Sequence, residues 1–291
     1  MLHRTIKRLA VTACVFAVMA ALSGCSSTTR VTIATLDTPE SILLGEVMAQ
    51  QLEQFDFEVV RGSRYSGLME LEAGMRANEF DVSGLFIQDA LAELIGERPI
   101  FDQVLTQEIV GNTLQDMFGY TLLDGWNISG GYAIAMHSDL HFGLAELPRY
   151  SHRLTLAATH DFIYSIGGLA HMRELFGEIE FADIVIVHEA DFYNSAQLGA
   201  DILAMRTYSI GDWLRDSGYI STQSELSVWP INNFVPIIEE DILDRHPEIR
   251  TVLSSIAFQI ETDRFAGKLH SIWQGETTVE AAATEILQFR R

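Results

Sequence analysis

The feature that most constrains the fold is a regular alternation of short apolar segments with longer stretches of helical periodicity. A helix is expected to begin at Pro39, because threonine (Thr38) is a good N-cap and proline suits the first helical position. Such alternation predicts an α/β fold built on parallel strands. The strand-like segments of the first half are residues 31–36, 57–60 and 81–86.

The alternation restarts in the middle of the chain, and from about residue 239 the tail reads as several helices. Two blocks of this kind predict two α/β lobes. Ligands of open α/β sheets lie beyond the carboxyl ends of the strands, so a cleft between the lobes is the expected site. The strand-like segments of the second block are residues 132–136, 153–159, 183–187 and 200–205.

The first 25 residues have the pattern of a bacterial export signal. A positively charged start precedes an apolar run, LAVTACVFAVMAAL, that is too short to span a bilayer of roughly 30 Å as a helix. The stretch LSGC, which ends at Cys25, resembles a lipobox. We expect residues 1–24 to be a lipoprotein signal peptide, Cys25 to be lipidated and residues 25–30 to be a tether. The alternative is a plain secretory peptide.

Charge and cysteine content exclude several classes of protein. The formal net charge is −21 and the chain has only two lysines, so a nucleic-acid partner is not expected. The only cysteines are Cys14 and Cys25, both in or next to the signal, which leaves none for a disulfide, a metal site or a nucleophile. The acidic composition suits either a high-salt habitat or an ordinary acidic envelope protein.

The sequence offers no positive case for an enzyme, a metal or a cofactor. Nucleotide-binding glycine loops, the G-x-S-x-G elbow and the H-E-x-x-H motif are all missing. His137 and His141 have a spacing suited to two metal ligands on a helix, but they straddle an expected strand end and are better read as surface residues. Polar pairs that follow strands are read as solvent-facing loop starts, although catalytic groups also gather there: His160 with Asp161, and His188 with Glu189.

Aromatic residues gather at strand ends and crossovers, the positions that would line an interlobe cleft. Each one alone could be a core or rim residue. Together, their faces would hold a cation that has no hydrogen-bond donors, such as a quaternary ammonium. The set comprises Phe86, Tyr132, Phe162, Tyr164, Tyr208, Trp229 and Phe234.

The order and spacing of several stretches resemble the substrate-binding proteins of osmoprotectant ABC importers, those for glycine betaine, choline and carnitine. The resemblance covers nearly all of residues 31–291. It is carried by VTIATLDTPESILLGEVMAQQLE, LEAGMRANEFDVSGLF, FYNSAQLGADILAMRTYSIGD, VWPINNFVPIIEEDILDRHPEIRTVL and GETTVEAAATEIL.

The resemblance implies a type-2 periplasmic binding protein fold, in which two lobes close on a solute and deliver it to a permease. Lobe 1 is expected to comprise residues 31–128 and 229–291, and lobe 2 residues 129–228. The crossovers are expected near 125–131 and 226–231. The stretch VWPINNFVPII (228–238) could be a buried strand, a crossover or a loop, and the resemblance favours the return crossover.

The family's site residues match this chain only in part. Tyr132 and Tyr208 fall where the family places cage tyrosines, and Phe86 falls where a third is usual. Ser41 stands in place of a common glutamine, and Ile231 stands where a fourth tyrosine is expected.

The expected function is that of a lipid-anchored, extracytoplasmic receptor for a compatible solute, facing the periplasm or the exterior. The alternatives are the same fold with another solute, such as an amino acid, or an envelope sensory or interaction module without transport. The residues predicted to face the ligand's cation are Phe86, Tyr132, Tyr208 and Trp229, with Tyr164 as a further aromatic. Those predicted for its carboxylate or hydroxyl end are Thr38, Ser41, Asn232 and Asn233.

Overall fold

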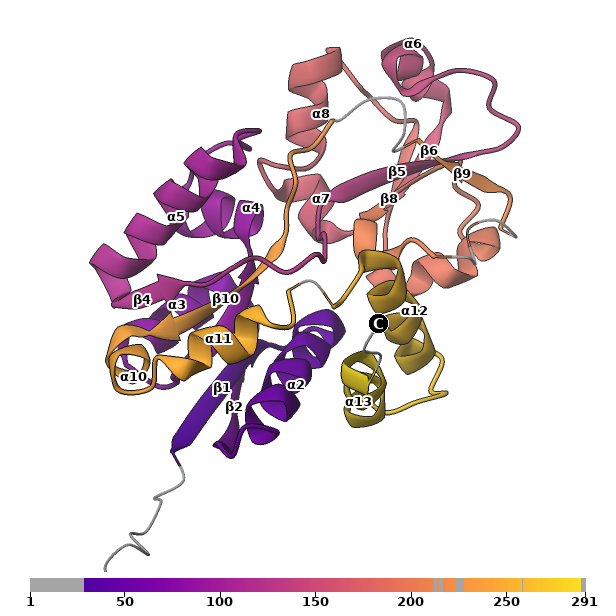
Figure 1. The fold of residues 1–291 in the computed structure, drawn as a ribbon. Helices are drawn as coiled ribbons and strands as arrows, with labels where there is room; N and C mark the ends of the chain where they lie inside the picture. The colour runs from indigo at the N-terminus through magenta and orange to yellow at the C-terminus, as the bar shows by residue number, and fades with distance from the viewer. Residues whose placement is uncertain (1–28, 212–213, 215–216, 223–227, 258, 289–291) are drawn as a thin grey trace, which may run out of the picture.

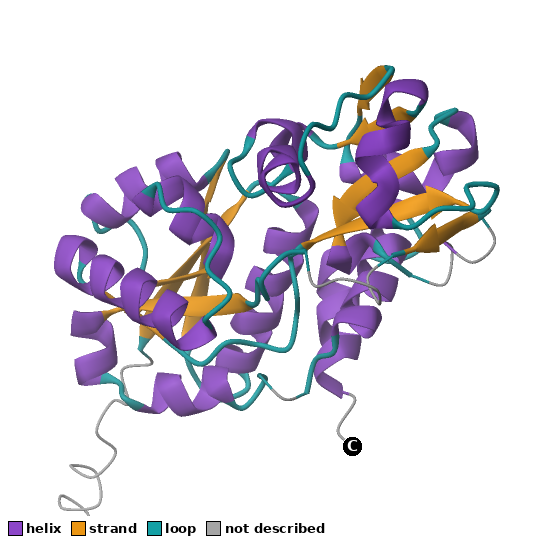
Figure 2. Cartoon of the chain, turned by 90° about the horizontal axis from the view of Figure 1, so that it is seen from above, coloured by secondary structure: helices purple, strands orange, loops and turns teal. Residues whose placement is uncertain are grey.

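The computed structural model describes residues 29–288, apart from 212–213, 215–216, 223–227 and 258. The chain forms two α/β lobes, each with a five-stranded sheet and flanking helices (Figure 1, Figure 2). The predicted two-lobed α/β architecture is therefore confirmed. Within the described residues, no helix is both long enough and apolar enough to cross a membrane.

The first lobe is built on a sheet with strand order β2-β1-β3-β10-β4. Its strands are β1 (Arg30–Leu36), β2 (Glu58–Tyr65), β3 (Val82–Phe86), β4 (Tyr120–Leu122) and β10 (Phe234–Glu239). Its helices are α2 (Pro39–Glu53), α3 (Leu68–Arg76), α4 (Ile87–Ala90), the π-turn η1 (Leu91–Ile95), α5 (Gln103–Phe118), α10 (Glu240–Arg245) and α11 (Glu248–Ser254).

The second lobe is built on a sheet with strand order β7-β6-β8-β5-β9. Its strands are β5 (Tyr132–His137), β6 (Thr155–Ala158), β7 (Asp183–Ile186), β8 (Ile202–Arg206) and β9 (Tyr219–Ser221). Its helices and helical turns are η2 (Leu144–Glu146), α6 (Leu147–Tyr150), η3 (Ser151–Arg153), α7 (His160–Tyr164), α8 (Leu169–Phe176), η4 (Glu189–Gln197) and η5 (Thr207–Ser209).

Both sheets are mixed: each has the parallel core that the alternation predicts, β2-β1-β3 and β7-β6-β8, together with antiparallel strands that it did not predict. In the first sheet β1 runs parallel to β2 and β3, whereas β10 runs antiparallel to β3 and β4. In the second, β5 runs antiparallel to β8 and β9. The antiparallel members are the strands by which the chain enters the second lobe and returns to the first. In the described residues 123–131, which lead from β4 into β5, no helix intervenes.

Strand β10 contains Pro236, a residue that cannot donate to a ladder and is rare inside sheets. Its neighbour β4 is only three residues long and pairs with positions 237–239. At Pro236 the strand needs only an acceptor on this side, because the Pro236 carbonyl receives the amide N–H of Leu123 at 2.9 Å. The second half of VWPINNFVPII is therefore a central strand, and its first half belongs to the crossover.

Two described segments carry the chain between the sheets, residues 123–131 and 228–233. They pair with one another through the backbone hydrogen bond from Gly130 N to Asn232 O at 2.7 Å and through an antiparallel bridge between Ser129 and Asn233. Part of the predicted second crossover lies outside the described residues. The paired segments form a short two-stranded connection between the lobes, which is the arrangement a hinge requires.

The last two helices, α12 (Thr262–Trp273) and α13 (Val279–Gln288), pack against different elements. Helix α13 lies along α2, where the Thr284 hydroxyl donates a hydrogen bond to Gln50 Oε1 at 2.8 Å. Helix α12 contacts the second lobe as well, where Phe265 meets the Tyr208 ring edge-on at 6.2 Å. The lobe boundaries expected from the sequence stay a prediction.

Candidate functional site

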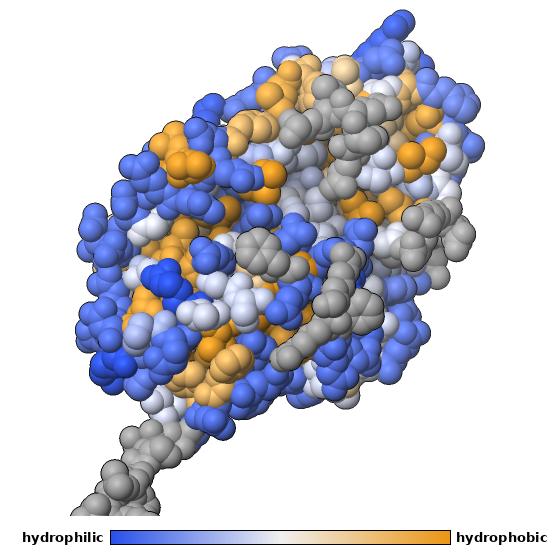
Figure 3. Space-filling view, viewed as in Figure 1, coloured by the Kyte–Doolittle hydropathy of each residue, from blue (hydrophilic) through white to orange (hydrophobic). Residues whose placement is uncertain are grey.

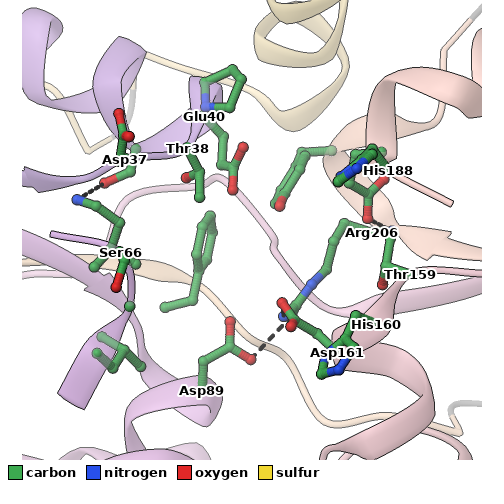
Figure 4. A pocket seen from close by; sticks show the side chains of 18 of the residues that line it. Asp37, Thr38, Glu40, Ser66, Asp89, Thr159, His160, Asp161, His188 and Arg206 are labelled. Carbon is green, nitrogen blue, oxygen red and sulfur yellow. Dashed lines mark hydrogen bonds and ion pairs between the residues drawn. The ribbon is translucent and has the colours of Figure 1, made fainter. Parts of the chain in front are cut away.

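A cavity of about 560 Å³ lies between the two lobes. It opens at the carboxyl ends of β1 and β3 from the first lobe and of β6, β7 and β8 from the second. This is where open α/β sheets place their ligands. Figure 4 shows side chains from the two lobes facing one another across it. Much of the protein face seen in Figure 3 is hydrophilic, in keeping with the acidic composition.

The first lobe contributes the start of α2 and the end of β3. Thr38 is the N-cap of α2 with extended backbone angles, and Pro39 occupies the first turn, as the sequence predicted. Glu40 follows and points into the cavity (Figure 4). Burial raises the pKa of the Glu40 carboxyl above its usual value. Among the described residues, no basic side chain lies within ion-pair distance of this carboxylate.

The second lobe contributes two charges of opposite sign, the buried Arg206 at the end of β8 and the partly buried Glu189 after β7. The Glu189 carboxylate accepts a hydrogen bond from the Ser209 hydroxyl at 2.6 Å and one from the Arg206 backbone N–H at 3.1 Å. Burial is the main influence on this group and raises the pKa of Glu189 to about 7. Glu40 adds to that increase through charge repulsion from the opposite wall.

Arg206 reaches across the cavity to the first lobe. Its Nη1 lies 3.0 Å from Asp89 Oδ1 and donates to the Gly130 carbonyl at 2.7 Å. Its guanidinium carbon lies 4.2 Å from the centroid of the Tyr132 ring, a cation–π geometry. The residue is only 7% exposed. Figure 4 draws the Arg206–Asp89 contact as the link between the two walls.

The amide of Asn232 supports the same cluster from the return crossover. Its Nδ2 donates to Asp89 Oδ1 at 3.1 Å and to the Gly130 carbonyl at 3.2 Å. Its Oδ1 accepts the backbone N–H of Gln88 at 2.7 Å. The amide of Asn232 therefore makes its hydrogen bonds within the protein and positions Asp89. The sequence had suggested instead that Asn232 contacts the ligand's carboxylate.

The aromatic side chains fall into two groups instead of one open cage. Phe86 and Tyr208 are stacked on each other, with ring centroids 5.6 Å apart and an interplanar angle of 28°. Tyr132 and Trp229 meet edge-to-face at 6.0 Å, and Phe162 packs on both. Arg206 covers a face of Tyr132. In this conformation the aromatic faces are largely in contact with other groups of the protein.

The predicted site residues divide among three locations. The main cavity is lined by Thr38, Ser41, Phe86 and Tyr208. A smaller adjoining cavity of about 30 Å³ is lined by Tyr132, Trp229 and Asn232. Neither cavity is lined by Tyr164, which is 66% exposed, or by Asn233.

Two of these residues have side chains already engaged within the protein. The hydroxyl of Ser41 accepts the backbone N–H of Leu36 at 2.9 Å, so it fixes the end of β1. The indole N–H of Trp229 donates to the Gly167 carbonyl at 2.7 Å. Ile231, where the resemblance led us to expect an aromatic, is 53% exposed and lines neither cavity.

Sequence reasoning missed the charged residues of the site, namely Glu40, Asp89 and Arg206. It also assigned the pairs at 160–161 and 188–189 to solvent-facing loop starts, yet all four of those residues line the cavity. His160, Asp161 and His188 are exposed at its rim, whereas Glu189 is partly buried. Their position directly after strands β6 and β7 was the available signal. Among the described residues, no group of three or more metal-ligating side chains is present.

Comparisons with known proteins support the fold assignment. No protein-family model matches the sequence, and no curated protein matches it either. Solved structures do. A glycine betaine/carnitine/choline ABC transporter protein superposes with a TM-score of 0.74 at 14% identity, covering 89% of this chain and 97% of that one.

Two further structures share the fold. Ligand-free YehZ from Escherichia coli gives a TM-score of 0.68 at 17% identity, with 90% of this chain and 98% of that chain covered. Lactococcal OpuAC, closed on glycine betaine, gives 0.56 at 11% identity, with 89% and 95% covered. At such identities the likeness establishes the fold. The chain has the two-lobed fold of the periplasmic binding proteins, shared with solute-binding components of osmoprotectant ABC transporters.

Proposed function

We propose that this protein captures a small solute between its two lobes and delivers it to the permease of an ABC importer. The observation that carries the proposal is the 560 Å³ cavity at the strand ends of both lobes, in a fold shared with binding proteins of such transporters. The paired segments at 123–131 and 228–233 supply the hinge about which the lobes would close.

The ligand we propose is a quaternary-ammonium osmoprotectant such as glycine betaine. Carboxylates outnumber basic side chains in the cavity wall, so its electrostatic potential favours a cation. Tyr208, Phe86 and Tyr132 lie within or beside the cavity and offer aromatic faces. Glycine betaine is also the solute bound to lactococcal OpuAC, and glycine betaine, carnitine and choline are named for the first structural relative.

We further propose that the protein is held at a membrane surface outside the cytoplasm. This rests on the signal-like residues 1–24 and on Cys25, which lie outside the described residues. Strand β1 begins at Arg30, so a lipid on Cys25 would leave a tether of only a few residues before the fold. The lobes would therefore stay close to the membrane that contains the permease.

A second candidate ligand is an amino acid, favoured by one feature of the cavity. Arg206 offers a guanidinium suited to a carboxylate, while Glu40, Glu189 and Asp161 offer partners for a primary ammonium. An amino acid would use hydrogen bonds where a betaine would use aromatic faces.

Calorimetric titration tests both candidates with one protein preparation. Glycine betaine, choline and carnitine form one panel and the common amino acids form the other. The proposal expects saturable heat with the first panel only. Heat with the second panel alone would replace the osmoprotectant by an amino acid. If neither panel gives a heat of binding, the proposed capture of a solute is itself contradicted.

A further inference from the structure

The guanidinium of Arg206 occupies the position that a bound cation would take on Tyr132. It lies over the ring at 4.2 Å, within the range of a cation–π contact. Tyr132 has limited freedom to present another face, because Phe162 and Trp229 pack edge-to-face around it at 5.2 and 6.0 Å. The aromatic surface that a quaternary ammonium would need is therefore already in use.

The guanidinium also makes the polar contacts of a bound ligand. It pairs with Asp89 at 3.0 Å and donates to the Gly130 carbonyl at 2.7 Å. These partners belong to different parts of the molecule, since Asp89 lies in α4 of the first lobe and Gly130 lies in the crossover. The three contacts together bridge the lobes, as a captured solute does in a protein that closes by hinge motion.

Asp89 determines what can replace this guanidinium. Burial raises the pKa of its carboxyl, and the charge of Arg206 opposes that increase. If Arg206 moved away, Asp89 would keep one hydrogen bond, from Asn232, but would lose its cation. An unpaired buried charge is costly, so a neutral solute would be a poor replacement and a cation a good one.

We infer that Arg206 is a tethered cation that occupies the ligand's aromatic face, and that a cationic solute binds by displacing it from Tyr132 and Asp89. The inference rests on the proposed function and deepens it by naming the residue that sets its affinity and its selectivity for cations. Arg206 is a specificity-determining residue because the solute must compete with it. The apparent association constant equals the intrinsic constant multiplied by the fraction of molecules in which the face is free.

The test compares Arg206→Met, which keeps the apolar stem and removes the charge, with Arg206→Lys, which keeps the charge and loses the flat fork. Arg98→Met is the matched control, because Arg98 forms an exposed interlobe ion pair with Glu174 away from the cavity. Each protein is titrated with glycine betaine and with choline. If the face is free in roughly one molecule in ten, Arg206→Met binds about tenfold more tightly than the wild type. Arg206→Lys falls between them, and the control matches the wild type.

A crystal structure of the wild-type protein with the bound solute is the second readout, and it does not depend on the variants folding. The expected complex has the solute's cation on Tyr132 and the Arg206 side chain turned away. An Arg206 that stays on Tyr132 overturns the inference. A loss of affinity in Arg206→Met also overturns it, because that result makes Arg206 a direct ligand contact.

The failures of the two proposals are distinguishable. Binding of a quaternary ammonium to the wild type without a gain in Arg206→Met overturns the displacement alone. Heat with amino acids only, lost in Arg206→Met, overturns the displacement and replaces the proposed osmoprotectant by a carboxylate-bearing ligand. If no solute gives a heat of binding with any of the proteins, both proposals are overturned.

Discussion

Arg206 and Asp89 form an ion pair of 3.0 Å across the cavity, joining strand β8 of the second lobe to helix α4 of the first. Both side chains are largely buried, at 8% and 21% exposure, so solvent screens their attraction far less than at a surface. The pair is therefore the main electrostatic tie between the cavity walls. A second interlobe pair among the described residues, Arg98 with Glu174, is exposed at 76% and 48%.

The double variant Asp89→Asn, Arg206→Gln is expected to loosen the ligand-free lobes, because it removes both charges without leaving either one unpaired. Small-angle X-ray scattering should show a larger radius of gyration than that of the wild type. The corresponding variant of the exposed pair, Arg98→Gln, Glu174→Gln, should scatter like the wild type, since exposed pairs contribute little. Equal radii for all three proteins would show that the buried pair does not hold the lobes together.

Aromatic faces, and not the tyrosine hydroxyls, are expected to hold the solute. Tyr132→Leu and Tyr208→Leu should each weaken glycine betaine binding about fivefold or more, since a desolvated cation–π contact is worth roughly 1–2 kcal/mol. The phenylalanine variants of the same positions should keep most of the affinity. Calorimetric titration distinguishes these outcomes. Equal losses for phenylalanine and leucine would assign the contact to the hydroxyls.

Glu189 should make the protein less stable as the pH rises from about 4.5 to about 7. Burial raises its pKa to about 7 from the ordinary glutamate value of 4.5, so the folded protein retains a proton in this window that the unfolded chain has lost. The free energy of unfolding should fall by up to about 1.4 kcal/mol per pH unit for this one proton. Above pH 7 both states are deprotonated, and this contribution becomes constant.

The Glu189→Gln variant provides the comparison for that pH profile. It should be more stable than the wild type at pH 8 and should lack this part of the decline between pH 5 and 7. Urea unfolding at each pH measures the difference. If the two proteins show parallel profiles, the carboxyl of Glu189 has an ordinary pKa in the folded state.

Two glycines are expected to respond to alanine in opposite ways. A Cβ at Gly84 would lie 2.0 Å from the ring of Phe234, which is 2% exposed and packed on Trp126. Gly84→Ala should therefore cost about 1–3 kcal/mol through overpacking. Gly267 lies within α12, where an added Cβ would meet nothing within 4 Å, so Gly267→Ala should gain about 0.5–1 kcal/mol. Thermal unfolding of both variants measures the contrast, and destabilisation by Gly267→Ala would contradict it.

Cys25 is expected to carry the membrane anchor. Cys25→Ser should move the protein from the membrane fraction to the soluble fraction of the cell envelope, because the thiol that accepts the lipid is lost. Cys14→Ser is the matched control and should leave the distribution unchanged, since that residue lies within the expected signal peptide. Retention of Cys25→Ser in the membrane fraction would point to a different means of attachment.

The strands and helices could be predicted from the sequence because hydrophobic periodicity is a local property. Segments such as 31–36 and 183–187 alternate or cluster apolar residues, and they form β1 and β7 as expected. Thr38 and Pro39 marked the start of α2 for the same reason, since an N-cap is defined by its nearest neighbours. The direction of β10 was not predictable in this way, because it depends on which strands flank it.

Hydrophobic periodicity was enough to predict the two-lobed α/β fold, and Phe86 and Tyr208, which were expected at the cleft, line the cavity. The charged pair that bridges the cavity, Arg206 with Asp89, became visible only in the tertiary structure. Arg206 and Asp89 are 117 residues apart, and neither belongs to a motif or a periodic pattern. Their pairing exists only because the crossovers bring the ends of β3 and β8 together, in a buried space where an unpaired charge is costly. That contact places the Arg206 guanidinium on Tyr132. The contacts of the polar side chains in the site were therefore harder to predict from the sequence than the positions of its aromatic residues.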